Sequence, residues 1–396
     1  MCKDPSRTED HPRLMLTEGG PSHRLELRLG LIRTEAPSII RRAFLSVMAT
    51  WVPLLVLSAL QGNAIGDLVS IPFMRDFAVH ARFVVTVPLL LLAAPVLGPR
   101  LADAAAHFVG SGLLLERDYQ RFDSAIERGL KWRDSGAAEL VLVALAYALT
   151  ISNLRSAAVH VSTWYALRTA AGVDITWAGW WFVIFCVPLM QFLILRWLWR
   201  LFLWTQFLWR MNQLELQLIP THPDEAGGLA FVGEAQQYFG LILFAFSAAV
   251  AGVLANDIIY DGLPLAHFAP VIAVYVFLAV GIFFMPILLF CATLWRTKRL
   301  GLFQYGTLAK EYTTEFHCKW IMASRPPGEA LLGSGDIQSL ADLGNSYSFV
   351  KKMILVPTGF FTLFHLALAC LIPMAPLLLT MMPLEDILQM AFKVFL

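Results

Sequence analysis

The sequence predicts an all-α protein, a polytopic membrane helix bundle with about seven transmembrane helices and a cytoplasmic N-terminus. The first observation is composition: 58% of the 396 residues are hydrophobic and 15% are charged, with a mean hydropathy of +0.63. Soluble domains carry about 25% charged residues. The other two observations are seven long apolar stretches and an alternation of basic residues between the segments that join them.

The apolar stretches define the expected spans. A transmembrane helix needs about 20 mostly apolar residues. Seven stretches qualify: Ala43–Leu60, Phe83–Leu97, Ala137–Ile151, Gly179–Leu195, Phe239–Leu254, Phe268–Leu294 and Val350–Met381. The chain remains largely apolar after the second stretch, from Ala104 to Leu115, so this helix is expected to extend beyond the membrane.

The basic residues predict the orientation. With the N-terminus inside, the inner segments hold 25 of the 30 Lys and Arg residues and the outer segments hold 5. Cytoplasmic loops carry such an excess of Lys and Arg. Trp164 and Trp177 precede the fourth stretch, and Trp197 and Trp199 follow it, as expected for a helix between two interfacial belts. The C-terminus is then expected outside.

The same division predicts the domains. Residues 1–42 form a cytoplasmic segment, and residues 43–396 form the bundle, with cytoplasmic helical insertions at about 100–136, 196–237 and 296–349. Tyr119, Phe122 and Ile126 recur at helical spacing, which predicts an amphipathic helix that docks on the bundle or pairs in an oligomer. Alternating leucines in Arg24–Leu31 predict a short strand.

Charge and motifs exclude several classes of partner and activity. The net charge of +1 argues against a nucleic-acid partner. The expected partners are the lipid bilayer and, in a homo-oligomer, further copies of the chain. The five cysteines form no CxxC pair, so no disulfide framework or zinc site is expected. The sequence contains no GxxxxGK[ST], HExxH or GxSxG motif, and no pattern in it indicates a cofactor.

The first candidate site is the inner segment Pro220–Leu229. Its candidate ligand or ion contacts are His222, Asp224, Glu225, Gly227 and Gly228. Oxygen ligands suit hard divalent cations and the imidazole suits zinc, and Glu234 or His317 could complete the shell. In the alternative interpretation Asp224 caps a helix and the glycines permit a bend or close packing.

The second candidate site is Gly335–Ser346. Asp336 is expected to cap a short helix that Gly344 ends, and Asn345 is a candidate contact at an entrance. The alternative is a capped surface helix that leads into the last span. The HPDxAGGL pattern of the first segment and DIQSLADLGNS of the second resemble segments of uncharacterised bacterial multi-pass membrane proteins. This resemblance implies no activity.

Polar side chains within the spans form a third set of candidates: Gln191, Arg196, Arg200 and His365. Intramembrane polar residues are often functional. His365 lies mid-span, either as a neutral ring bonded to a neighbouring helix or as a proton relay. Arg196 and Arg200 share a helix face, either extending to the inner interface or forming an anion-attracting mouth.

These observations favour a channel or transporter for a small solute or ion in the bacterial inner membrane. One alternative is a sensor or scaffold acting through its cytoplasmic segments. A second alternative is a membrane-embedded enzyme with a cytoplasmic-face site that uses His222, Asp224 and Glu225, with His317 and Glu315. A continuous polar cavity would favour transport, and a closed bundle with an acidic inner pocket would favour the enzyme.

Overall fold

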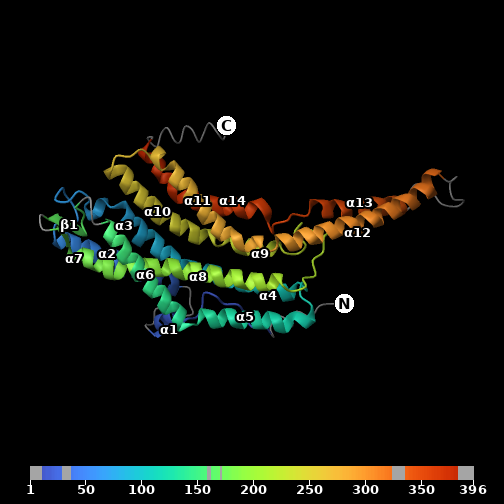
Figure 1. Ribbon diagram of the computed structural model, residues 1–396, viewed down its shortest axis with the longest axis horizontal. Helices are drawn as coiled ribbons and strands as arrows, with labels where there is room; N and C mark the ends of the chain where they lie inside the picture. Colours follow the sequence, from blue (N-terminus) through green and yellow to red (C-terminus); the bar gives the residue numbers. More distant parts are fainter. Residues whose placement is uncertain (1–10, 29–36, 158–161, 170–171, 323–334, 382–396) are drawn as a thin grey trace.

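The computed structural model describes residues 11–28, 37–157, 162–169, 172–322 and 335–381, and these residues form a helical bundle (Figure 1). Six helices among them are long and apolar enough to cross a membrane: Ile40–Leu60, Phe77–Gly110, Trp177–Asn212, Ala230–Tyr260, Leu265–Leu288 and Gly359–Thr380. A seventh span is formed if Glu116–Arg133 and Gly136–Ser152, which meet at 47°, count as one. The predicted fold class is therefore confirmed.

The first two spans pack against each other. Helix α2 (Pro37–Leu60) contacts the second span, which consists of α3 (Phe77–His80), the π-helical turn η3 (Ala81–Thr86) and α4 (Val87–Gly110). A short 3-10 turn, η2 (Phe73–Arg75), precedes α3. The second span continues without a break to Gly110, so the predicted extension beyond its apolar stretch is confirmed.

The next elements are a bent pair of helices and a further span. The turn η4 (Glu116–Asp118) leads into α5 (Tyr119–Arg133), and α6 (Gly136–Ala157) follows after a bend. The fourth apolar stretch comprises α7 (Trp177–Trp181), the π-helical turn η5 (Phe182–Cys186) and α8 (Val187–Asn212). Helix α8 contacts both α6 and α5.

The span Ala230–Tyr260 is the centre of the bundle. It consists of α9 (Ala230–Gln237) and α10 (Gly240–Tyr260), separated at Tyr238 and Phe239. Its most apolar window is 56% buried, whereas the other five windows are between 17% and 44% buried. This span is therefore the most enclosed of the six.

Two helices form an arm that extends beyond the bundle (Figure 1). Helix α11 (Leu265–Leu288) leads to α12 (Cys291–His317), which ends in the π-helical turn η6 (Cys318–Met322), and α13 (Gly335–Lys352) packs back along α12. The expectation that Gly344 ends a short helix is wrong. Gly344 does not have the positive φ of a helix-ending glycine, and α13 continues to Lys352.

The last span begins later than predicted. Val350 belongs to α13, and the chain is non-helical from Met353 until α14 (Gly359–Leu371), which the 3-10 segment η7 (Ile372–Thr380) continues. Pro357 lacks an N–H donor, and Thr358 adopts a left-handed backbone with φ 62°. Both features interrupt a helix, and the hydropathy of this region does not reveal them.

Segments that were predicted to share a side of the membrane meet at the same end of the bundle. At the end predicted to be outer, called the outer end below, a hairpin of β1 (Ala166–Thr169) and β2 (Gly172–Ile175) packs near the start of α3 and the end of α10. The hairpin is antiparallel, with Ala166 opposite Ile175. At the inner end, the loop after α8 contacts the segments before α5 and before α14.

The N-terminal segment packs against α5. His11 Nδ1 is 2.8 Å from an Asp123 oxygen, and Leu14 is fully buried. The expected strand Arg24–Leu31 is wrong for its described part, because α1 (Pro21–Arg28) is helical. The Ser22 amide donates to Glu139, and a lone strand would leave its own backbone groups unpaired. Residues 29–31 lie outside the described residues.

The amphipathic helix is confirmed as docked. Phe122 and Ile126 on α5 are each 1% exposed. The Phe122 ring lies 6.1 Å from Phe207 on α8, and Trp132 stacks on Trp199 at 6.0 Å between ring centroids. Apolar contact with the bundle therefore positions α5.

Candidate functional site

One carboxylate organises the inner loop Pro220–Leu229. Asp224 Oδ1 accepts from the amides of Ala226 (2.9 Å) and Gly228 (3.0 Å). Its Oδ2 accepts from the amides of Gly228 (3.1 Å) and Ala230 (3.1 Å). Ala230 is the first residue of α9. Asp224 therefore holds the loop together and satisfies a donor at the start of the central span.

These hydrogen bonds favour the ionised form of Asp224. Partial burial alone raises the pKa of the carboxyl, but the amide bonds from Ala226, Ala230 and Gly228 and the contact with His222 outweigh it, so the pKa lies below its ordinary value. His222 Nδ1 lies 2.7 Å from Oδ1. The carboxylate is thus negative at neutral pH and occupied by donors of its own loop.

The neighbouring residues tie this loop to the last span. Glu225 has a φ of 55°, and its carbonyl accepts from the Ile354 amide at 2.7 Å. Gly227 and Gly228 have φ values of 66° and 98°, which side-chain-bearing residues rarely adopt. A Cβ on Gly227 would also lie 3.1 Å from the Met353 Cε. The glycines therefore serve backbone conformation and close packing.

The other residues considered for a metal shell lie elsewhere. Glu234 is exposed on α9. The Thr221 hydroxyl lies 3.4 Å from that of Tyr305 on α12, and His317 is twelve residues further along, about 18 Å at helical rise. Within the described residues, no three His, Cys, Asp or Glu side chains are grouped so that they could hold a metal ion.

The second candidate segment lies on the arm. Asp336 Oδ2 accepts from Lys319 Nζ and Trp320 Nε1, each at 2.9 Å, and these two bonds lower the pKa of Asp336. The Tyr312 hydroxyl donates to the Asp336 carbonyl at 3.0 Å. Asp336 therefore joins the far ends of α12 and α13. Asn345 is exposed on α13.

Two intramembrane candidates make local contacts. Gln191 accepts from the Thr150 hydroxyl at 2.8 Å and so links α8 to α6. His365 is exposed on α14, and its Nδ1 lies 2.9 Å from the Phe361 carbonyl of the same helix. The expected bond from His365 to a neighbouring helix is wrong, because its side chain points away from the core.

The arginine pair contacts the N-terminal segment. Arg200 is 6% exposed, donates to the Thr17 carbonyl at 3.1 Å and lies 4.5 Å from the Trp197 ring centroid. Arg196 lines a small crevice with Arg200, Arg133 and Glu139. Arg200 thus holds the N-terminal segment in place through Thr17, and its side chain is buried instead of extending to the interface.

Three of the polar side chains on the central span, Gln236, Ser247 and Asn256, lie at intervals of 11 and 9 residues. Gln236 is fully buried, accepts from Trp204 Nε1 at 2.9 Å and donates to the Phe283 carbonyl at 2.5 Å.

Ser247 is also fully buried, 3.1 Å from the Tyr275 hydroxyl and 3.2 Å from Cys370 Sγ. Asn256 donates to Asp76 Oδ1 at 2.8 Å. Gln236 and Ser247 were not among the sequence candidates, since a single polar residue in an apolar run does not reveal which way it faces.

A buried carboxylate at the outer end was also missed. Asp76 is 6% exposed and accepts from the Val79 amide (3.1 Å) and Trp164 Nε1 (2.7 Å), besides Asn256. Tyr165 packs beside it, and burial together with the Asp76 charge raises the pKa of this phenol. Because Asp76 comes just before an apolar stretch, its position in the sequence is that of an ordinary helix cap.

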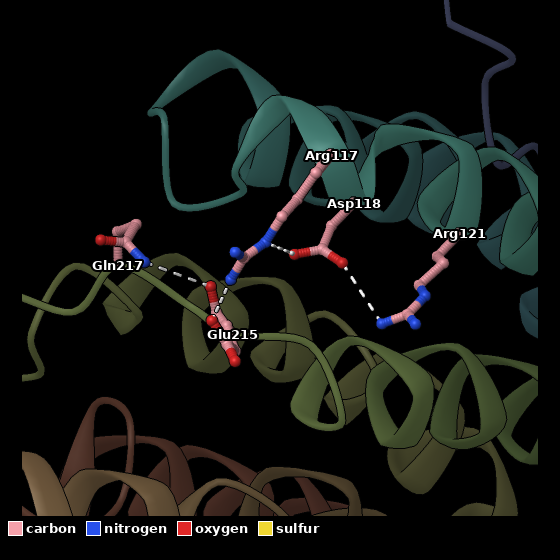
Figure 2. Close-up of polar contacts among 5 residues, drawn as sticks. All are labelled: Arg117, Asp118, Arg121, Glu215 and Gln217. Atoms are coloured by element: carbon pink, nitrogen blue, oxygen red, sulfur yellow. Dashed lines mark hydrogen bonds and ion pairs between the residues drawn. The ribbon is translucent and has the colours of Figure 1, made fainter.

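An ion-pair network joins η4 and the start of α5 to the loop after α8 (Figure 2). Arg117 bonds Glu215 and lies 3.8 Å from Asp118, and Arg121 lies 3.4 Å from the other Asp118 oxygen. The Gln217 side chain donates to the Glu215 carbonyl at 3.5 Å. Both arginines are largely exposed, so solvent weakens these pairs.

No protein-family model, curated protein or solved structure matches the chain.

Replacing Asp224 with Asn should lower the stability of the protein by about 1–2 kcal/mol. Helix caps usually tolerate this change. Here both carboxylate oxygens accept backbone N–H groups, and the Asn amide would place a donor against one of them. Asp224→Ala should cost more. Thermal unfolding in detergent measures both, with Glu225→Gln as the matched charge control.

The same variant should change the pH dependence. Because the folded-state pKa of Asp224 is lowered, its stabilisation is present above the unfolded value of about 3.9 and is lost as pH falls through the folded value. Asp224→Asn should therefore lose less stability between neutral pH and about pH 3 than the wild type does. Parallel acid profiles for the two proteins would contradict the assignment.

Replacing Asp76 with Ala should lower stability by about 3 kcal/mol, because Trp164, Asn256 and the Val79 amide would lose their acceptor in a buried site. Asp67→Ala is the control, since the Asp67 side chain is 98% exposed. Its effect should stay within about 0.5 kcal/mol. Equal unfolding midpoints for the two variants would show that Asp76 is not a structural acceptor.

Proposed function

We propose that this membrane protein carries a small solute or ion across the bacterial inner membrane along the polar side chains of its central span. The observation that supports the proposal is the series Gln236, Ser247 and Asn256, which runs from the inner to the outer end of the span Ala230–Tyr260. Polar groups inside a bilayer are costly, and they commonly mark solute or ion pathways.

Interruptions of the helices beside this series give further support. The central span is broken between α9 and α10, and the last span is preceded by the non-helical segment that ends at Thr358. The Thr362 hydroxyl donates to the Gly233 carbonyl at 3.3 Å, so α9 and the start of α14 contact each other. Discontinuous helices form the binding sites of many transporters. The π-helical turn η3 also contacts α10, and such turns are frequent at functional sites.

In this proposal the inner loop Pro220–Leu229 lies at one mouth of the route. It directly precedes α9, and His222 is exposed there while Glu225 is partly exposed. His222 Nδ1 already accepts from the Asp224 amide of its own loop at 3.3 Å. The exposed part of the His222 side chain and the partly exposed Glu225 are the proposed first contacts of a solute at the inner face.

Reconstitution in liposomes tests the proposal. Currents of K⁺, Na⁺ and Cl⁻ and swelling with small neutral solutes would be measured for the wild type, Ser247→Ala and Thr150→Val. We expect flux in the wild type and an altered rate or selectivity in Ser247→Ala. Thr150 is the matched control, because its hydroxyl contact with Gln191 lies between α6 and α8, outside the central series. Absence of flux for every solute, or equal effects of both variants, would refute the proposal.

The arm favours one alternative, a sensor or scaffold that acts through its cytoplasmic segments. Leu300, Phe303 and Leu308 on α12 are 60%, 66% and 50% exposed. Exposed apolar groups on an extended helix pair suit a protein contact, including one with a second copy. If Phe303→Ser/Leu308→Ser changes the oligomeric mass in nanodiscs and leaves solute flux unchanged, the arm serves assembly and not transport.

A further inference from the structure

A long apolar groove separates two spans on the outside of the bundle. It has a volume of about 1070 Å³ and lies between α11 and the α14–η7 span. Its lining includes Leu265, Ala273 and Phe284 on one side and Leu363, Ala367 and Met381 on the other. Ligand pockets usually measure about 300–1,000 Å³, so this groove has room for a large apolar ligand.

The groove runs across the whole membrane. Leu265 begins α11, and Phe284 lies one turn before its last residue. The distance between them along the helix is about 29 Å, close to the roughly 30 Å of bilayer hydrocarbon. A Cβ on Gly281 would meet no heavy atom within 4 Å, so the groove is open at this level.

Basic residues, here called the basic rim, lie along the chain beyond the inner end of each groove helix. Arg296, Lys298 and Arg299 follow α11, and Lys351 and Lys352 precede α14. No Asp or Glu occurs in residues 289–310 or 343–360. The Lys298 ammonium donates to the Met353 carbonyl at 2.8 Å, which holds the two basic segments together. The Glu225 carbonyl accepts from the Ile354 amide, so the inner loop lies beside the second of these segments.

We propose that the groove binds an anionic phospholipid of the cytoplasmic leaflet, with its acyl chains between α11 and α14 and its phosphate at the basic rim. Basic clusters directly inside a transmembrane helix attract anionic headgroups by about 1 kcal/mol for each Lys or Arg. A second copy docked through this groove by a two-fold axis along the membrane normal would bring two basic rims together. The charge pattern therefore selects a lipid and not a protomer.

Native mass spectrometry of the full chain tests the site. The protein would be taken from nanodiscs that contain equal amounts of phosphatidylglycerol and phosphatidylcholine, and retained lipids and oligomeric mass would be recorded. The wild type should retain phosphatidylglycerol preferentially. Lys351→Ala/Lys352→Ala should reduce that preference about tenfold or more, since two charges are lost. The matched control, Lys131→Ala/Lys310→Ala, removes two exposed charges elsewhere on the inner surface and should retain it.

A second variant tests the apolar part of the site. Ala273 is exposed in the groove, so Ala273→Trp fills it without displacing the core and should reduce retention of both lipids. Inorganic phosphate added to the wild type should not displace the lipid, because it lacks the acyl chains. Equal retention of the two lipids, displacement by phosphate alone, or a change of oligomeric mass without a change of bound lipid in Ala273→Trp would overturn the proposal.

Discussion

Phe122→Asp should destabilise the protein more than most single substitutions, by about 4 kcal/mol or more. Removing a buried Phe side chain alone costs about 3–5 kcal/mol, and the new carboxylate would be desolvated in an apolar contact. Phe122 is 1% exposed, and its ring lies 6.1 Å from Phe207 and 5.8 Å from His11. Helix α5 should separate from α8, and the N-terminal segment beneath it should become accessible.

Thermal unfolding in detergent and limited proteolysis near Arg13 measure this effect. Ser124→Asp is the matched control, because Ser124 is exposed on the same helix two residues away. We expect a much lower unfolding midpoint and faster cleavage for Phe122→Asp only. Equal behaviour of the two variants would show that α5 does not depend on this contact.

Gly252→Leu should prevent the bundle from assembling. A Cβ at Gly252 would lie 2.6 Å from the Ala81 Cβ and 2.9 Å from the Phe77 carbonyl oxygen, so the central span and α3 approach each other too closely for any side chain. Even Gly252→Ala should cost about 1–3 kcal/mol through overpacking. That loss would occur although Ala is favoured over Gly by about 1 kcal/mol inside a helix.

Gly281→Ala is the matched control for this crossing. Gly281 also lies inside a membrane-spanning helix, but a Cβ there would meet no heavy atom within 4 Å. Its unfolding midpoint should equal or exceed that of the wild type. A Gly252→Ala protein as stable as Gly281→Ala would contradict the close crossing of α10 and α3.

The apolar spans could be predicted because they depend on the length of apolar runs. The docking of α5 could be predicted from the spacing of Tyr119, Phe122 and Ile126. Helix α1, found where a strand was expected, could not be predicted, because contacts with α6 position Pro21 and Ser22. The start of the last span depends on the left-handed Thr358, a backbone property that hydropathy does not contain.

The polar core was harder to predict from sequence. Asp224 is one of the sequence candidates, but its four hydrogen bonds from backbone amides come from a loop geometry that residue spacing does not specify. Asp76 and Gln236 act through Trp164 and Trp204, which are 88 and 32 residues away. One sequence pattern does not pair residues at such separations. The groove between α11 and α14 likewise depends on how two apolar helices diverge.

The most direct test of the two-ended bundle is cysteine labelling on intact cells. Single cysteines at Ser22, Ser334 and Ala266 would be placed in a chain from which the five native cysteines had been removed. A membrane-impermeant maleimide should react with the cysteine at position 266 from outside, and those at 22 and 334 should react only after the cells are opened. Labelling of position 334 from outside would contradict the assigned sides of the membrane.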